Sequence, residues 1–218
     1  MKHFPYIAIH HERLTLRMLE VCHAKLLFDL VEKEKKYLSE YMSWVHEERG
    51  VSTEIDRIAR AGADYFSGKE CPWGIWLEPE AKLIGTIGLR TPSVRDNPLM
   101  KEIGYWISEG YRGRGFATLA TQMAIVTAFS KLGSDRVAIR HNRQNIPSRR
   151  VVEKCGFILE GTLRNAMAAP TAEMIARGHT RERTYLTYSL IPEDLPALPW
   201  YEEMCAAIHY EPLRQITE

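Results

Sequence analysis

Two glycines and two arginines alternate in the segment Arg112-Gly113-Arg114-Gly115, between an apolar stretch and an expected helix. Glycine adopts positive φ at no steric cost, so several N–H groups of such a turn can converge on one anion. The first turn of the following helix adds free N–H groups and the positive end of its dipole at the same place. Arginine side chains beside the turn are suited to charge-assisted hydrogen bonds with phosphate oxygens. The segment therefore predicts a site for a diphosphate.

Two common diphosphate ligands are disfavoured by the residues around this turn. No Gly-Lys-Ser or Gly-Lys-Thr segment follows, so the P-loop of nucleoside triphosphatases is not matched. Thr118 stands where the dinucleotide fingerprint requires its third glycine. We therefore expect a diphosphate that belongs to neither ATP nor NAD.

Two motifs resemble those of a known family. Residues 112–117, Arg-Gly-Arg-Gly-Phe-Ala, resemble the Arg/Gln-x-x-Gly-x-Gly/Ala acetyl-coenzyme A signature of the GNAT superfamily, the Gcn-related N-acetyltransferases. Residues 145–161 are similar to the Asn-x-x-Ser…Gly-Phe-x-x-x-Gly segment of that family, and the two motifs follow in the expected order. Residues 102–107 and 160–164 are closest to the branch that includes the ribosomal-protein serine and alanine N-terminal acetyltransferases. The resemblance covers residues 14–190.

The resemblance implies an enzyme that transfers an acetyl group from acetyl-CoA to a primary amine by direct attack on the thioester. The acceptor it favours is the N-terminal α-amine of a ribosomal or other protein. Acetyl-CoA would be the cosubstrate, and no metal is expected. The residues it assigns to coenzyme binding are Ile107, Arg112, Gly113, Arg114, Gly115, Ala117, Thr118, Asn145 and Ser148.

Three residues are candidates for the chemistry of acetyl transfer. In the branch that this chain resembles, a serine at the position of Ser148 lies near the thioester sulfur; the alternative is that Ser148 and Asn145 only cap a helix. The base that receives the proton of the amine is expected to be Glu102 or Glu160. Relatives can carry an acidic residue near the position of Met167, so this replacement leaves the base open.

Two other functions remain open from the sequence. One is acetylation of a small-molecule amine, such as an antibiotic, a polyamine or an amino acid. The other is a sensor that binds acyl-CoA without turnover. A peptide acceptor predicts an open groove, whereas a small cation predicts an enclosed acidic pocket.

The pattern of strands and helices predicts an α/β (α+β) fold. We expect one mixed, mostly antiparallel sheet of about seven strands with helices on both faces. The resemblance implies that the fourth and fifth strands part like a V to admit the coenzyme. The expected strands are 14–19, 73–77, 82–90, 100–108, 136–140, 157–164 and 184–190. The expected helices are 24–43, 53–67, 115–131, one that begins near Pro147 and ends at Gly156, and 201–208; residues 168–178 are expected to form a loop.

Size and charge limit the remaining classes. The chain has 218 residues, 29 lysines and arginines, and 28 aspartates and glutamates, which suits one acetyltransferase domain over residues 1–191. Residues 192–218 would be an extension that packs on this domain or on a partner subunit. A balanced charge makes nucleic acid an unlikely partner. We expect a cytoplasmic monomer or homodimer, with neither a secretory signal at its start nor a membrane span.

Overall fold

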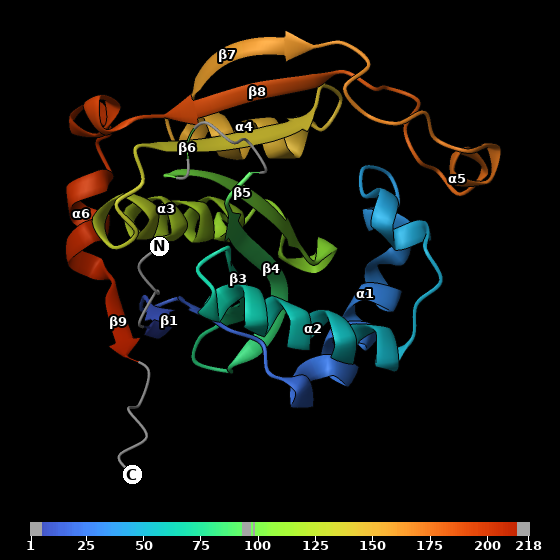
Figure 1. The fold of residues 1–218 in the computed structure, drawn as a ribbon, viewed down its shortest axis with the longest axis horizontal. Coiled ribbons are helices and arrows are strands. Elements are labelled where there is room, and N and C mark those ends of the chain that lie inside the picture. Colours follow the sequence, from blue (N-terminus) through green and yellow to red (C-terminus); the bar gives the residue numbers. More distant parts are fainter. Residues whose placement is uncertain (1–5, 93–96, 98, 213–218) are drawn as a thin grey trace.

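One sheet runs through the whole computed structural model, which describes residues 6–92, 97 and 99–212 (Figure 1). Its strand order is β7-β8-β6-β5-β4-β3-β2-β1-β9, and the pairing is antiparallel except between β5 and β6. The mixed, mostly antiparallel sheet is confirmed, but among the described residues it has nine strands instead of about seven. The strands are β1 (Tyr6–His10), β2 (Leu14–Arg17), β3 (Glu70–Leu77), β4 (Lys82–Arg90), β5 (Met100–Ile107), β6 (Arg136–Asn142), β7 (Ile158–Leu163), β8 (Tyr185–Leu190) and β9 (His209–Pro212).

The two strands that the sequence did not predict lie together at one edge of the sheet. β1 and β9 pair with each other, and β1 also pairs with β2. His10 stacks on His209 with their ring centroids 4.8 Å apart, and Nε2 of His10 lies 3.1 Å from the carboxylate of Glu211. β1 and β9 are about two hundred residues apart in the chain, and each is stabilised by pairing with the other. The alternation of polar and apolar residues within either strand therefore gives little indication that it forms. Through β9, the end of the described chain is part of the main sheet.

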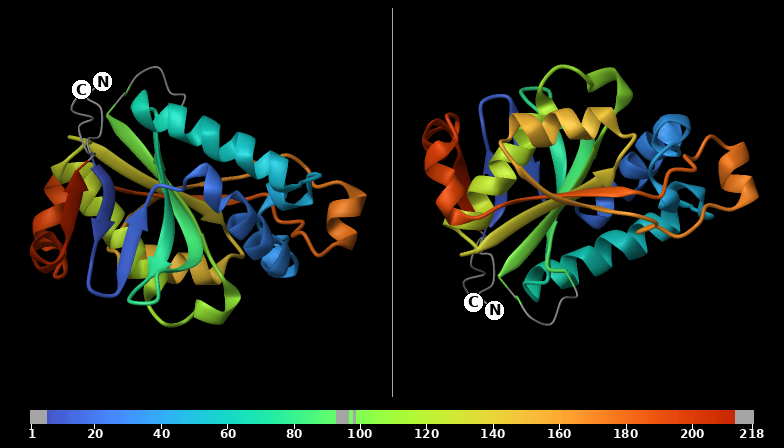
Figure 2. Two further views of the ribbon diagram at one scale, coloured as in Figure 1. Left: turned by 90° about the horizontal axis from the view of Figure 1, so that it is seen from below. Right: turned by 90° about the horizontal axis from the view of Figure 1, so that it is seen from above.

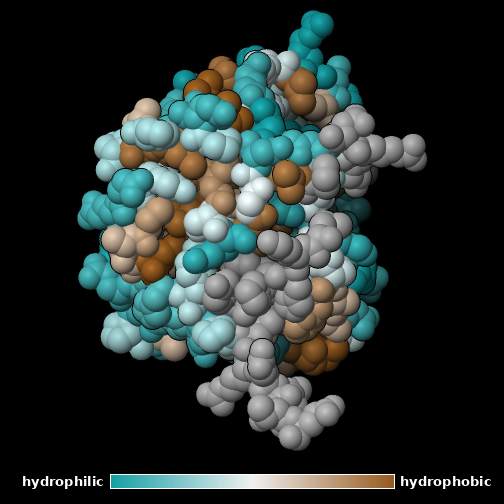
Figure 3. All heavy atoms as spheres, turned by 60° about the vertical axis from the view of Figure 1, so that its left-hand side comes forward, coloured by the Kyte–Doolittle hydropathy of each residue, from teal (hydrophilic) through white to brown (hydrophobic). Residues whose placement is uncertain are grey.

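Helices cover both faces of the sheet, as expected (Figure 2). The helices α1 and α2 contact β4 and β3 on one face, whereas α3 and α4 contact β5 and β6 on the other, and α6 packs against α3. The face that carries α6 mixes hydrophilic and hydrophobic residues (Figure 3). No helix in residues 6–92 or 99–212 is long and apolar enough to cross a bilayer. The helices are α1 (Ala24–Leu38), α2 (Val51–Phe66), α3 (Phe116–Ser130), α4 (Ile146–Lys154), α5 (Ala172–Ala176) and α6 (Tyr201–Ala207).

Most expected helices and strands shift by three residues or fewer at their ends, and two expectations differ more. Helix α1 ends at Leu38, short of the expected residue 43, because Ser39 closes it: the Ser39 hydroxyl donates to the carbonyls of Lys36 and Arg177. The expected loop at 168–178 contains the short helix α5, whose first turn is capped by the Thr171 hydroxyl accepting from the N–H of Met174 at 3.2 Å. The contact of Ser39 with Arg177 places the end of α5 against the end of α1, and this long-range contact is not visible in the sequence.

The sheet opens between β5 and β6, the fourth and fifth of the expected strands. Their parallel pairing joins Met100, Lys101 and Glu102 to residues 136–138 and then stops, while β6 continues its pairing with β8 up to Asn142. From Ile103 to Ile107, the edge of β5 that faces β6 therefore pairs with no strand among the described residues. We call this the released edge of β5. The V-shaped opening expected from the resemblance is present, and the site lies in it.

Candidate active site

The glycine turn has the backbone conformation that its sequence predicts. Gly113 has φ +70° and Gly115 has φ +84°, both in the left-handed region that favours glycine. Gly115 is the N-cap of α3, and its carbonyl accepts from the N–H of Leu119 at 2.9 Å. The earlier N–H groups of α3 have no acceptor within the helix, so they are available to an anion.

Helix α1 holds the start of this turn in place. The buried carboxylate of Glu34 accepts a hydrogen bond from the Ser108 hydroxyl and another, at 2.9 Å, from the N–H of Glu109. The guanidinium of Arg112, which directly precedes Gly113, stacks over the ring of Tyr37, also on α1, at 4.6 Å. The turn is therefore clamped between the strand that precedes it and a helix from the opposite face of the sheet.

A cavity of about 500 Å³ extends from the turn into the opening between β5 and β6. Of the residues expected to bind the coenzyme, eight line it: Ile107, Arg112, Gly113, Gly115, Ala117, Thr118, Asn145 and Ser148. Arg114 does not; its guanidinium lies over the Phe116 ring at 5.2 Å. A phosphate contact of Arg114 therefore stays a prediction.

Two cations in this cavity were missed by the sequence reasoning. Arg150 and Lys154 lie on α4 and line the same cavity as Arg112. They are four residues apart, a spacing that places side chains on one face of a helix. This spacing was visible in the sequence, but only the position of α4 against the turn directs that face toward the cavity.

Ser148 is joined to a tyrosine at the inner end of this cavity. The Ser148 hydroxyl lies 3.0 Å from the hydroxyl of Tyr105, on β5, and burial raises the pKa of Tyr105 above its usual value. The cap is made by other atoms: the side-chain oxygen of Asn145 accepts from the backbone N–H of Ser148 at 3.1 Å. The helix cap therefore does not use the Ser148 hydroxyl.

A second cavity, of about 780 Å³, opens on the other side of this pair. The residues that border both cavities are Met42, Tyr105, Trp106, Asn145 and Ser148. We call the 500 Å³ cavity the coenzyme cavity and the 780 Å³ cavity the acceptor cleft, after the roles proposed for them below, because a molecule in each would meet the other at Ser148. Met167 also lines this cleft.

The two carboxylates predicted from the sequence occupy different places. Glu102 is buried and lines the acceptor cleft, where its two oxygens accept from Arg90 at 2.6 Å and Arg140 at 2.8 Å. Glu160 borders neither cavity; it pairs with Arg136 at 2.8 Å, and hydrogen bonds from Arg136 and Ser189 hold its pKa below the usual range. The structure thus brings Glu102 together with Ser148 and leaves Glu160 outside.

A family model matches most of the chain. Residues 13–158, which include the turn, Tyr105 and Ser148, match the family model described as "Acetyltransferase (GNAT) domain". The chain belongs to the GNAT acetyltransferase family. Within the residues that the structure describes, no group of three histidine, cysteine, aspartate or glutamate side chains is placed to hold a metal.

Several GNAT proteins resemble this chain over most of its length. It is 31% identical to the ribosomal-protein-serine acetyltransferase of Escherichia coli K12, over 71% of this chain and 84% of that protein. It is 30% identical to the putative ribosomal N-acetyltransferase YdaF of Bacillus subtilis 168, over 72% of this chain and 84% of that one. The structure of RimJ from Mycobacterium smegmatis in complex with CoA-disulfide superposes with a TM-score of 0.76, covering 93% of this chain and 95% of that chain, at 18% identity. At this identity, the last comparison supports the fold.

Gly115→Val tests the GNAT glycine turn. A residue with a side chain costs about 1–3 kcal/mol in the left-handed region, so the turn is expected to shift and its N–H groups to diverge. We expect the KM for acetyl-CoA to rise at least about tenfold. Gly133→Val is the matched control, because Gly133 also has positive φ (+62°) but borders neither cavity. An equal rise of KM in both variants would contradict a role of the turn in coenzyme binding.

Proposed function

We propose that this chain transfers the acetyl group of acetyl-CoA to the N-terminal α-amine of a protein. The observation that carries the proposal is the hydrogen-bonded pair of Tyr105 and Ser148, which stands where two separate cavities meet. A coenzyme that enters from the glycine turn and an acceptor that enters from the other side would have their reacting groups at this pair. Holding two reactants in such a geometry removes much of the entropic barrier to their reaction.

The coenzyme cavity suits the chemistry of acetyl-CoA. The glycine turn and the first turn of α3 would hold the diphosphate, and Arg112, Arg150 and Lys154 would neutralise its charge. The released edge of β5 between Ile103 and Ile107 would bind the arm that leads to the thioester. Bound acetyl-CoA would supply the activated acetyl group, and the RimJ structure, which is a complex with CoA-disulfide, supports this reading.

Ser148 and Tyr105 would act on the leaving thiolate. As the new C–N bond forms and the C–S bond breaks, the Ser148 hydroxyl would donate its proton toward the sulfur. The phenol of Tyr105 is protonated at neutral pH even at the ordinary tyrosine pKa of about 10, and burial raises this pKa further, so it can donate a hydrogen bond to Ser148 in turn. Backbone N–H groups on the released edge of β5 would stabilise the oxyanion of the tetrahedral intermediate.

The proton of the acceptor amine would leave by way of Glu102 or water. An α-amine has an ordinary pKa near 8, so a strong base is not required near neutral pH. Glu102 is the buried carboxylate of the cleft, but each of its oxygens already accepts from an arginine. We propose that Glu102 mainly positions Arg90 and Arg140, and that solvent in the open cleft carries the proton away.

Acetylation of a polyamine or an aminoglycoside is the weaker alternative. Those substrates are polycations, which require an acidic pocket, whereas the acceptor cleft is lined by five arginines: Arg49, Arg57, Arg60, Arg90 and Arg140. The names of the two sequence relatives, both of which refer to ribosomal N-acetylation or ribosomal-protein acetylation, support a protein acceptor.

The direct test is to incubate the purified chain with acetyl-CoA and a mixture of N-terminal peptides, polyamines and aminoglycosides. Thiol release gives the rate, and mass spectrometry identifies the product. We expect peptides acetylated at the α-amine. Acetylated polyamine or aminoglycoside alone would favour the small-molecule function, and tight binding of acetyl-CoA without any product would favour a sensor.

A further inference from the structure

The acceptor cleft gathers arginines from three separate parts of the chain. Arg49 precedes α2, Arg57 and Arg60 lie on α2, and Arg90 and Arg140 lie on β4 and β6. The carboxylates that line the cleft are Glu102 and the exposed Glu47, with the buried Glu54 behind them. Arginines therefore outnumber carboxylates, although the whole chain is nearly neutral.

Internal ion pairs neutralise this cluster only in part. The single carboxylate of Glu102 is shared by Arg90 and Arg140, and that of Glu54 is shared by Arg49 and Arg57. A guanidinium has five N–H donors, so an arginine that shares one carboxylate keeps donors for another anion. For the fifth arginine, Arg60, the described residues provide no ion pair.

The spare donors are accessible from the cleft. The side chains of Arg57, Arg90 and Arg140 are 45%, 56% and 38% exposed, and Arg60 is also exposed. The buried carboxylates fix the guanidinium groups of the first three from behind. Since these groups are already ordered, binding a further anion costs less side-chain entropy.

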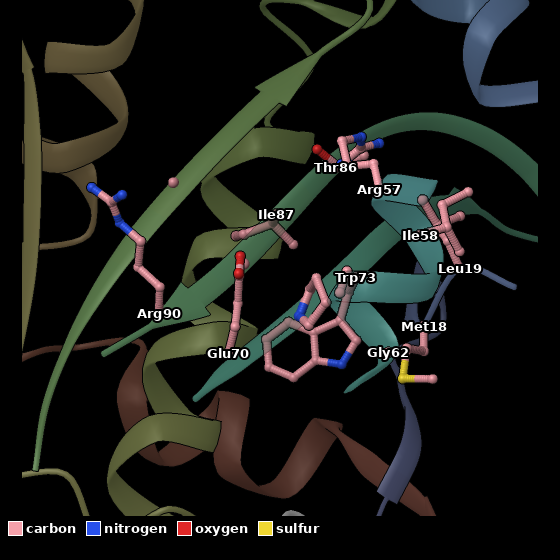
Figure 4. A pocket seen from close by; sticks show the side chains of 14 residues that line it. Met18, Leu19, Arg57, Ile58, Gly62, Glu70, Trp73, Thr86, Ile87 and Arg90 are labelled. Atoms are coloured by element: carbon pink, nitrogen blue, oxygen red, sulfur yellow. The ribbon is translucent and has the colours of Figure 1, made fainter. Parts of the chain in front are cut away.

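The cleft continues beyond the arginines into a smaller groove between α2 and the sheet (Figure 4). This groove, of about 150 Å³, shares Arg57, Thr86, Gly104 and Arg90 with the acceptor cleft. Its walls are mainly apolar, and it contains one carboxylate, that of Glu70; the apolar lining residues are Met18, Leu19, Ile58, Ala61, Pro72, Trp73 and Ile87. A molecule that reaches from Ser148 to this groove has to pass the arginines, which suits an extended chain better than a compact amine.

We infer that the acceptor is a polypeptide N-terminus with aspartate or glutamate among its first few residues, whose carboxylates bind the arginines of the acceptor cleft. This inference rests on the proposed function and specifies its substrate class. The same arginines disfavour a positively charged ammonium group near them, and so favour the neutral amine that attacks the thioester. Recognition of the acceptor and activation of its amine would thus have one electrostatic cause.

Three matched peptide sets test the inference. They share the same first residue and length and carry alanine, aspartate or lysine at positions two to four. We expect kcat/KM to be about tenfold higher for the aspartate set than for the alanine set, and lower still for the lysine set. The difference should shrink at raised ionic strength, because the arginines are partly exposed.

Failure of the inference and failure of the proposed function give different results. Equal acetylation of the aspartate and alanine sets would overturn the acidic acceptor and leave the N-acetyltransferase function intact. No acetylation of any peptide would overturn both. If a small amine that carries a phosphate or carboxylate were acetylated faster than every peptide, the acceptor would not be a polypeptide. Only the part of the inference that assigns an anionic group to the acceptor would then stand.

Arg60→Glu links the preference to the cleft. Because Arg60 is exposed and free of a structural ion pair, the variant is expected to fold, which its thermal unfolding midpoint checks. We expect the ratio of kcat/KM for the aspartate and alanine sets to fall roughly fivefold. Arg149→Gln is the control, since Arg149 is exposed on α4 and lines neither the acceptor cleft nor the coenzyme cavity. An unchanged ratio in Arg60→Glu would overturn the assignment of the anion to this cluster.

Discussion

Ser148→Ala is expected to lower kcat for peptide acetylation by about a hundredfold or more, with little change in the KM for acetyl-CoA. A general acid typically contributes a factor of about 10² to 10⁴ to the rate, and the Ser148 hydroxyl is the group best placed to protonate the thiolate. The helix cap survives this change, because the N–H that donates to Asn145 belongs to the Ser148 backbone. Steady-state thiol release at saturating acetyl-CoA and peptide measures the effect.

Two further variants separate chemistry from helix capping. Tyr105→Phe removes the partner hydroxyl at 3.0 Å and should lower kcat by roughly tenfold, because the Ser148 hydroxyl then loses the hydrogen bond that orients it. Asn145→Ala removes the cap and is expected to cost about 1 kcal/mol of stability. If Ser148→Ala retained full kcat while Asn145→Ala lost stability, Ser148 would be a capping residue only.

Glu54→Gln is expected to lower the free energy of unfolding by about 3 kcal/mol or more. Glu54 is fully buried on α2 and accepts hydrogen bonds from Arg49 and, at 2.9 Å, from Arg57. The Arg49 side chain is only 6% exposed, so a neutral amide would leave a buried positive charge without its counterion. Urea denaturation followed by tryptophan fluorescence measures the loss.

An exposed ion pair provides the control for this prediction. Glu173 pairs with Arg177 at 2.5 Å on α5, with the two side chains 71% and 53% exposed. Exposed pairs contribute less than about 1 kcal/mol, so Glu173→Gln should change stability little. A similar small loss in both variants would mean that the Glu54 network does not stabilise the region around α2.

Local sequence was enough for the parts of the site that depend on one short segment. Gly113 and Gly115 adopt positive φ, which glycine does at no steric cost. Asn145 caps α4 by accepting from Ser148, only three residues away. The turn and helix from Ser108 to Ser130 formed as expected for the same reason, because their hydrogen bonds join neighbours in the chain. The preceding strand was also expected, although it pairs with β4 and β6. These segments also carry the motifs that resemble the GNAT family.

Tertiary structure decided which side chains face one another across the opening of the sheet. The divergence of β5 from β6 leaves room for α4, and the Tyr105 hydroxyl on β5 meets that of Ser148 there. The sequence predicted either Glu102 or Glu160 as the base. In the structure, Glu160 lies on β7 and pairs with Arg136, outside both cavities.

The amino-acid sequence by itself therefore determined the glycine turn, the helix cap and the family motifs, because backbone conformation and capping act over a few residues. Only the tertiary structure decided that β1 pairs with β9, that Arg150 and Lys154 face the coenzyme cavity, and that arginines from three elements share one cleft. The physical reason is that these contacts join residues far apart in the chain. Ion pairing and burial depend on distances in space, which only the packed sheet and helices define.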